Sequence, residues 1–437
     1  MPSLMETHLE RTLQVKDLAE RGERYTDALM QLWIELRALH ERLWDLPGQD
    51  RVLLALCLNE VGTLLRREKS LWRNEKPEFF VAYDLAMKAI GSIPGAPRSF
   101  KRFGSGLRVN PVDLWITIAG NLGFAGLDTG CVDLGSLEND FLRAWQTCMD
   151  FPLPQDSIQV MELKMGTAKV MVARRAPGET AEAYKLGEEV YHTAERLLCD
   201  VRKKGMKEGA FLAYSLAPVF MDFIDVCFFC EQPKVAAFAA QKVADFEIEC
   251  RDWISDPLFF AEARASLALA MARLLKCDPG FYGSPEQRRK ALGTIKDHLR
   301  HADALLDSLG RDPNDEAKLH HAIIPIRIRR NHAEALALSI RGRHKEALAK
   351  YRATSDLCFE FYWTGGPATL YDLYMDEIDA GLAQGRKIDD FHFNRLMKWG
   401  KRLGLNSERL EEIRKRKQGI KAPRGKTRMA GASSPAR

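Results

Sequence analysis

The sequence has no long hydrophobic run and no secretion signal. Nowhere in its 437 residues do apolar residues follow one another for the roughly 18 positions that a membrane-spanning helix needs. The first 18 residues mix acidic and basic side chains and lack the apolar segment of a signal peptide. We therefore expect a cytoplasmic protein that does not bind a membrane.

Cysteine is present but not in the pattern of a disulfide framework. Nine cysteines, an odd number, are scattered between Cys57 and Cys358, whereas small secreted domains carry dense, paired cysteines. Cys227 and Cys230 form a lone CxxC pair in an apolar helical stretch, without a second pair or a histidine at zinc-finger spacing. We interpret them as buried structural thiols, with a metal or redox site as the alternative.

Familiar catalytic and nucleotide-binding motifs are also missing. There is no nucleophile elbow, Walker A loop, HExxH motif or EF-hand loop. The glycines of "WITIAGNLGFAG" (115–126) have the spacing Gly-x-x-Gly-x-x-Gly, which differs from the dinucleotide fingerprint. Asn110, Pro111 and Asp113, just before them, are typical of a helix start. We expect a helix here and no nucleotide.

Histidines cluster without completing a metal site. Six of the ten lie between 298 and 344, and His298 and His301 would share a helix face. No carboxylate or thiol completes an obvious ligand set, so we expect no metal and no cofactor.

The small positive net charge comes from the end of the sequence. Nine basic residues and no acidic one lie in 414–437, which leaves 56 of the 65 basic residues against 60 acidic ones in residues 1–413. The tail 414–437 is also small and polar, and we predict that it is disordered. The body of the protein is slightly acidic.

Apolar residues at intervals of three and four dominate the rest of the chain, as in amphipathic helices. Clear examples are residues 25–46, 181–204, 258–276 and 333–357. Alternation typical of β-strands is hard to find. We predict an all-α fold.

Proline and glycine divide the helical stretches at regular intervals, as helix-ending signals do. Such breaks occur at 92–97, 103–111, 150–156, 175–179, 277–285, 309–315 and 363–368. They predict helical hairpins in one repeat domain, residues 1–413, with loops concentrated around 92–156.

A packing pattern recurs about every fifty residues. It consists of a large residue, a gap of two, an apolar and a small residue, a gap of two and another apolar residue, as expected where a second helix approaches closely. "Trp115-x-x-Ile118-Ala119-x-x-Leu122" is a clear copy. The small residues of six copies, some of them weak, are Gly62, Ala119, Ala168, Ala217, Ala268 and Ala335, at steps of 57, 49, 49, 51 and 67 residues.

Between these copies, small or medium residues recur at separations of four and three. The clearest set is Ala82, Ala86 and Ala89, closed by Pro94. Looser sets are Ala183/Gly187/Val190, Ala236/Ala240/Val243 and Ala347/Tyr351/Thr354. We predict that they mark the second helix of each hairpin.

With these two patterns the chain resembles the tetratricopeptide-repeat (TPR) superfamily. The segment from Ala335 to Tyr351 nearly fills one unit, and loose matches cover residues 12–360. The family repeat has about 34 residues, so the helices or loops here must be extended. The resemblance implies a TPR-like α-solenoid, that is, a right-handed superhelical array of antiparallel helix hairpins; an irregular all-α fold is the alternative.

The resemblance also implies a ligand groove lined by the first helix of each pair. By analogy with family positions, the lining residues are Asn59, Thr63, Arg66, Ile116, Gly120, Gly123, Met165, Lys169, Tyr214, Arg329 and His332. These residues do not form the combination of several lysines and asparagines with which some family members hold a peptide's C-terminal carboxylate, so that ligand is not implied. Trp363, in the aromatic stretch 359–367, is a second candidate for partner contact, with a place in the core as the alternative.

Three functional hypotheses follow. The first is a non-catalytic adaptor or regulator that binds a protein or peptide partner in the groove. The second is a nucleic-acid-associated protein in which Arg414, Lys415, Arg416 and Lys417 neutralise phosphates, although no aromatic residues are interleaved for base stacking. The third is a helical nuclease, because Arg327 and His332 match the Arg-x4-His element of certain helical ribonucleases.

Overall fold

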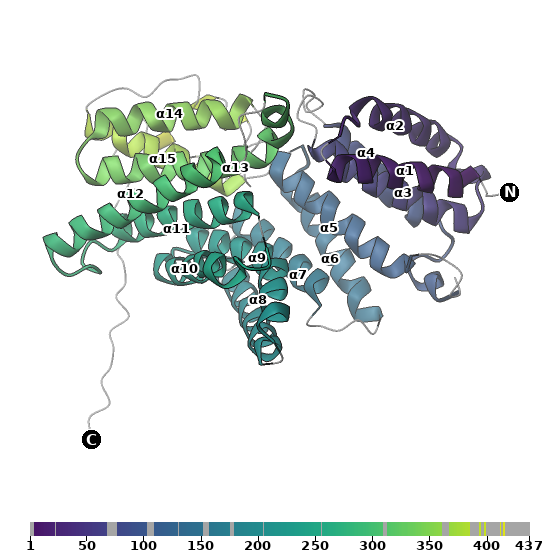
Figure 1. Ribbon diagram of the computed structural model, residues 1–437, viewed down its shortest axis with the longest axis horizontal. Helices are drawn as coiled ribbons and strands as arrows, with labels where there is room; N and C mark the ends of the chain where they lie inside the picture. The colour runs from purple at the N-terminus through teal and green to yellow at the C-terminus, as the bar shows by residue number, and fades with distance from the viewer. Residues whose placement is uncertain are drawn as a thin grey trace.

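The computed structural model describes most of the chain up to residue 384. The described ranges are 4–21, 23–67, 77–102, 109–129, 131–151, 157–174, 179–203, 205–254, 256–308, 313–360 and 367–384, with a few positions between 393 and 415. These residues form fifteen α-helices and no strand, so the predicted all-α fold is confirmed for them (Figure 1). Most of the tail 414–437 lies outside the described residues.

The helices follow one another with short connections. They are α1 (Leu4–Glu20), α2 (Thr26–Glu41), α3 (Gly48–Arg67), α4 (Glu78–Gly91), α5 (Pro111–Thr129), α6 (Leu134–Asp150), α7 (Ile158–Arg174), α8 (Glu179–Arg202), α9 (Met206–Phe229), α10 (Pro233–Cys250), α11 (Pro257–Cys277), α12 (Pro285–Asp307), α13 (Pro313–Ile340), α14 (His344–Glu360) and α15 (Pro367–Ala383). Short 3-10 helices lie at Leu43–Asp45 and Arg98–Arg102. Residues 92–156, expected to be rich in loops, contain α5 and α6.

Helix starts are encoded locally. Six of the described helices begin with proline, which has no N–H to leave unpaired in the first turn. The predicted start of α5 is confirmed, because the Asn110 side-chain oxygen accepts a hydrogen bond from the Val112 N–H at 3.0 Å. At α12, Ser284 and Gln287 form a reciprocal capping box.

Consecutive helices pack against each other from α3 to α15. The six small residues of the recurring pattern fall on α3, α5, α7, α9, α11 and α13, and each of these helices also contacts the next one in that series. The predicted second-helix sets fall on α4, α8, α10 and α14, and their residues are buried. The odd-numbered helices from α3 to α13 therefore form a continuous row, which we call the odd row.

Large side chains of the even-numbered helices fill spaces that glycines leave in the odd row. The clearest is Phe141 of α6, which lies between Gly123 of α5 and Gly166 of α7. A Cβ on Gly123 would lie 2.4 Å from Phe141 Cζ, and one on Gly166 would lie 2.5 Å from Phe141 Cε1. Both glycines thus allow one aromatic ring to enter the row.

The odd row returns toward its beginning. Helix α13 contacts α3, and α15 contacts α7. Ile324 and Ile328 of α13 belong to the same apolar cluster as Leu58 of α3, whereas Leu336 of α13 belongs to a second cluster that spans α7 to α13. Figure 1 shows α13 at the top of the molecule, reaching toward the N-terminal helices. Helix α13 thereby joins the two cores.

Helix α9 is the one described helix that is long and apolar enough, by length and composition, to cross a membrane. However, 67% of its most apolar window is buried inside the protein. It packs against α7, α8, α10 and α11. It has the surroundings of a core helix.

Candidate functional site

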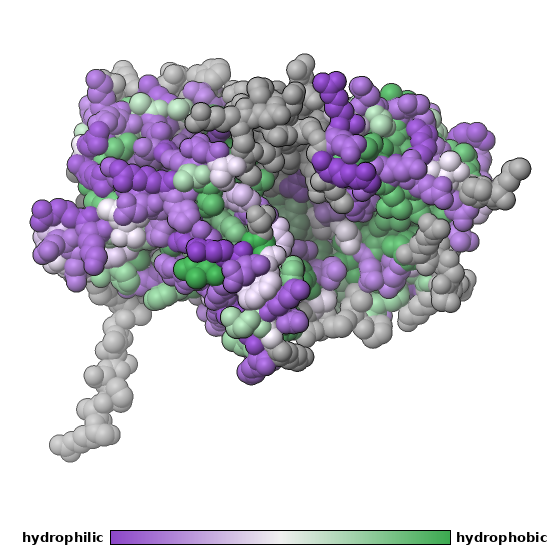
Figure 2. Space-filling view, in the orientation of Figure 1, coloured by the Kyte–Doolittle hydropathy of each residue, from purple (hydrophilic) through white to green (hydrophobic). Residues whose placement is uncertain are grey.

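A cavity of about 510 Å3 opens between four helices of the odd row, α3, α5, α7 and α9. Ile116, Gly120 and Phe124 line it from α5 at four-residue spacing, which places them on one helix face. Pro218 and Asp222 share a face of α9 in the same way. Figure 2 shows the surface hollowed in this region. We call this cavity the odd-row pocket.

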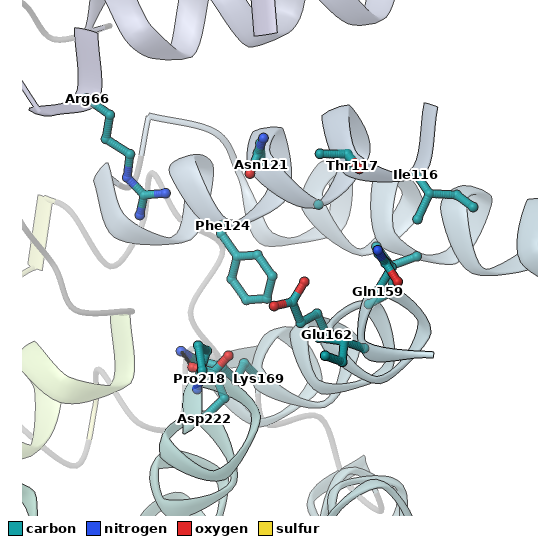
Figure 3. A pocket seen from close by; sticks show the side chains of 13 residues that line it. Arg66, Ile116, Thr117, Asn121, Phe124, Gln159, Glu162, Lys169, Pro218 and Asp222 are labelled. Carbon is teal, nitrogen blue, oxygen red and sulfur yellow. Dashed lines mark hydrogen bonds and ion pairs between the residues drawn. The ribbon is translucent and has the colours of Figure 1, made fainter. Parts of the chain in front are cut away.

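The odd-row pocket brings together four of the predicted groove residues. Arg66 comes from α3, Ile116 and Gly120 from α5, and Lys169 from α7 (Figure 3). They are separated by as many as 103 residues in the sequence, yet they line one cavity. A Cβ on Gly120 would meet nothing closer than Leu163 Cδ2 at 3.8 Å, so this position has room for a larger side chain.

Four other predicted residues do not line the pocket. Asn59 is buried, and its side-chain oxygen accepts a hydrogen bond at 2.9 Å from Asn121 Nδ2, which fixes a residue of the wall. Thr63 donates to the Asn59 carbonyl at 3.1 Å. Gly123 lies against α6 rather than at the pocket. Met165 is fully buried.

Tyr214 and His332 lie away from the pocket. Tyr214 is 37% exposed and donates its hydroxyl proton to Asp256 at 2.6 Å. His332 is buried, and burial lowers the pKa of its ring despite the neighbouring Asp376 carboxylate. The neutral ring therefore donates Nε2–H to Asp376 at 2.7 Å. Arg327 is exposed, so the structure does not place it and His332 in a common site.

The remaining predictions fall largely outside the described residues. Trp363, Arg416 and Lys417 belong to that group. Arg414 and Lys415 are exposed, and Arg414 forms an ion pair with Glu411 at 2.8 Å.

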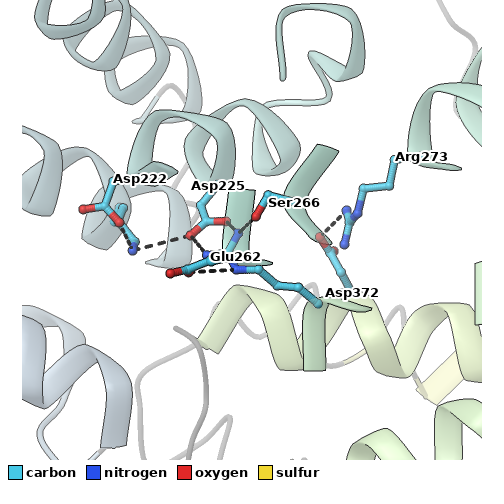
Figure 4. A network of polar contacts seen from close by, with 8 residues as sticks. Asp222, Asp225, Glu262, Ser266, Arg273 and Asp372 are labelled. Carbon is cyan, nitrogen blue, oxygen red and sulfur yellow. Dashed lines mark hydrogen bonds and ion pairs between the residues drawn. The ribbon is translucent and has the colours of Figure 1, made fainter. Parts of the chain in front are cut away.

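Beneath the pocket, Lys169 is held by two carboxylates of α9. Its Nζ atom lies 2.6 Å from Asp222 Oδ1 and 3.6 Å from Asp225 Oδ2 (Figure 4). Burial nevertheless raises the pKa of Asp222, although Lys169 opposes the shift. The lysine that lines the pocket is thus already paired within the protein.

Arg329 of α13 is the second cation of this network. It donates two hydrogen bonds to Asp225, each of 3.0 Å, and lies 3.4 Å from Ser266 Oγ and 3.7 Å from Glu262 Oε1. Although burial opposes it, the charges of Asp225 and Glu262 raise the pKa of Arg329. Arg329, predicted to face a partner, instead joins α9, α11 and α13.

Glu162 of α7 has the least compensated charge in the pocket. Within the described part of the chain, no hydrogen bond or ion pair reaches its carboxyl group. Burial, with a further contribution from Asp222, raises the pKa of Glu162 to about 7. Figure 3 shows the Glu162 carboxyl group and the Phe124 ring pointing toward one another across the cavity.

A second ionic cluster joins α11 to α15. Arg273 lies 2.9 Å from Asp372, and Lys276 pairs with Asp376 and, at 3.1 Å, with Asp379. These pairs tie α15 to α11.

The sequence predictions did not include the acids Glu162, Asp222, Asp225 and Glu262. One of them carried a usable signal. Glu162 lies three residues before Met165 and seven before Lys169, so it falls on the helix face already assigned to the groove. Extending that face by one turn toward the start of α7 would have found it.

The described residues bring no three His, Cys, Asp or Glu side chains together in an arrangement that could hold a metal ion. Cys227 is buried, and burial raises the pKa of its thiol. It is therefore a protonated core residue.

No protein-family model and no curated protein matches the sequence. The geometry of the odd-row pocket is therefore the basis for a functional proposal.

Proposed function

We propose that this protein is a non-catalytic adaptor or regulator that binds a segment of a partner protein in the odd-row pocket. The fold that goes with this proposal is a TPR-like right-handed superhelix of hairpins. In such an array the concave face carries the ligand, because successive first helices present their side chains to a common groove. The partner segment would run across α3, α5, α7 and α9.

One observation carries the proposal. Arg66, Ile116, Gly120 and Lys169 line a single cavity, as expected of groove residues that come from successive units. The cavity volume of about 510 Å3 lies in the range of pockets that enclose a ligand, which is roughly 300–1,000 Å3. Its walls combine apolar side chains with a few polar groups, as ligand pockets do.

The test fills the pocket without changing its charge. Gly120→Phe projects a ring into the cavity, because nothing but Leu163 approaches that position. Gly293→Phe is the matched control, since it also replaces a helical glycine, on α12, where a Cβ would meet nothing within 4 Å. Tagged wild type and both variants are used for affinity purification from cells, followed by mass spectrometry.

We expect partners recovered with wild type and Gly293→Phe to be lost with Gly120→Phe. Circular dichroism establishes that each variant is folded. Equal recovery with all three proteins would contradict docking at this pocket.

A further inference from the structure

We propose that the odd-row pocket takes a positively charged group, the guanidinium of an arginine or the ammonium of a lysine in the docked segment, and that this group lies between Glu162 and Phe124. The inference rests on the docking function proposed above and specifies the chemistry of the ligand.

Acidic groups outnumber basic ones in and beneath the cavity. Glu162, Asp222, Asp225 and Glu262 supply four carboxyl groups in and beneath the cavity, whereas Lys169 and Arg329 supply two cations. Adding Arg66, at the α3 end of the wall, still leaves the carboxyl groups in excess.

These cations are also committed to other groups. Lys169 lies between Asp222 and Asp225, and Arg329 donates two hydrogen bonds to Asp225. The charge of Arg66 acts on the hydroxyl of Tyr83 and opposes the rise in its pKa that burial causes. The carboxyl groups around the cavity therefore outnumber the cations, and a cation, which would favour the ionised form of Glu162, is the complementary ligand.

The ring of Phe124 forms an aromatic part of the cavity wall. The Phe124 ring is fixed by an edge-to-face contact with Phe141, with ring centroids 5.3 Å apart. Lys169 Nζ lies 6.0 Å from the Phe124 centroid, so the ring already lies beside one cation. A cation beside an aromatic face is attracted by the quadrupole of the ring. A ligand cation between Phe124 and Glu162 would meet the aromatic ring and a carboxyl group together (Figure 3).

Apolar side chains line the cavity beside the charged ones. Ile116, Leu163 and Pro218 supply apolar surface in the same cavity. Lysine and arginine carry their charge on a methylene stem that packs well on such surface. A bare metal ion would need several protein ligands, and the described residues offer no such set. An organic cation on an aliphatic chain fits the cavity better.

The test measures binding of three small probes to the purified full-length protein. The probes are N-acetyl-arginine N-methylamide, its citrulline analogue, which has nearly the same shape but no charge, and its glutamate analogue. Isothermal titration calorimetry at neutral pH and low salt gives each dissociation constant. We expect the arginine probe to bind roughly tenfold more tightly than the citrulline probe, as for a charge-assisted hydrogen bond.

Two variants assign the effect to Glu162. Glu162→Gln should reduce the affinity for the arginine probe to that of the citrulline probe. Glu10→Gln is the matched control, because Glu10 is an exposed carboxylate on α1 and its loss changes the net charge equally. It should leave binding unchanged. Gly120→Phe should abolish binding of the arginine probe.

Three results would overturn the inference. They are equal binding of the citrulline probe, preference for the glutamate probe, and absence of arginine binding at millimolar concentration. Each leaves the docking proposal to its own test, because loss of partners with Gly120→Phe does not depend on the charge of the ligand.

Discussion

The four carboxyl groups around the odd-row pocket differ in how they are paired. Asp222 and Asp225 contact Lys169, and Glu262 lies near Arg329. Among the described residues, no cation lies within ion-pair distance of Glu162. Burial and the charge of Asp222 raise its pKa to about 7. Near neutral pH this group is therefore close to half protonated.

The free energy of unfolding should report this proton. Between an unfolded-state pKa of 4.5 and a folded-state pKa of about 7, the folded protein holds a proton that the unfolded chain releases. Stability therefore falls as the pH rises through this range. Glu162→Gln removes the effect, and we expect this variant to gain about 3 kcal/mol over wild type by about pH 8 and nothing at about pH 4.

Chemical denaturation of wild type, Glu162→Gln and Glu10→Gln at several pH values measures this difference. Glu10→Gln should follow wild type throughout. A Glu162→Gln difference that stays constant with pH would show that the carboxyl group titrates normally.

Helix α5 carries two glycines, one beside open space and one in close contact with a neighbouring helix. Gly120 borders the pocket and has room for a side chain, whereas Gly123 lies against Phe141. Glycine lowers the stability of a helix interior by roughly 0.5–1 kcal/mol relative to alanine. At Gly120 the helix carries this cost without a close contact inside the protein, while at Gly123 the cost permits the entry of Phe141.

The two alanine substitutions should therefore have opposite effects. Gly120→Ala should raise the free energy of unfolding by roughly 0.5–1 kcal/mol. Gly123→Ala should lower it by about 1–3 kcal/mol, because the new Cβ would lie 2.4 Å from Phe141 Cζ and the ring would have to move. Urea denaturation measures both. Equal effects at the two positions would mean that α5 does not face α6 as described.

Across the whole molecule, α13 contributes residues to both large apolar clusters. Ile328 packs in the cluster that contains α3, and Leu336 packs in the cluster that contains α11 and α12. Both residues are almost fully buried, and they lie eight positions apart on the same helix. They therefore provide a matched pair for testing how the two ends of the chain are joined.

Hydrogen exchange should separate the two contacts. Ile328→Ala and Leu336→Ala should each cost roughly 2–5 kcal/mol. Ile328→Ala should reduce amide protection in α3 as well as in α13, whereas Leu336→Ala should reduce protection in α11 and α12 first. If α3 keeps its full protection in Ile328→Ala, the contact between α13 and the N-terminal helices contributes little to stability.

Much of the helical order could be predicted from the sequence, because hairpin packing demands small residues at repeated positions. Gly62, Ala119 and Ala335 all fall on helices of the odd row. The ionic network could not be predicted in the same way. Arg329 and Asp225 are 104 residues apart, and their pairing depends on how distant helices meet. Local spacing placed Arg329 in the groove but carried no information about this partner.

The contact between α3 and α13 joins two parts of the chain that lie far apart in the sequence. An open array can grow or shrink by a hairpin at either end, because each unit touches only its neighbours. Here α13 also contacts α3, and α15 contacts α7, so a helix pair inserted between them would have to preserve both contacts. Changes of side chains within the existing pocket preserve these contacts, and we expect them to be the easier route to a new specificity.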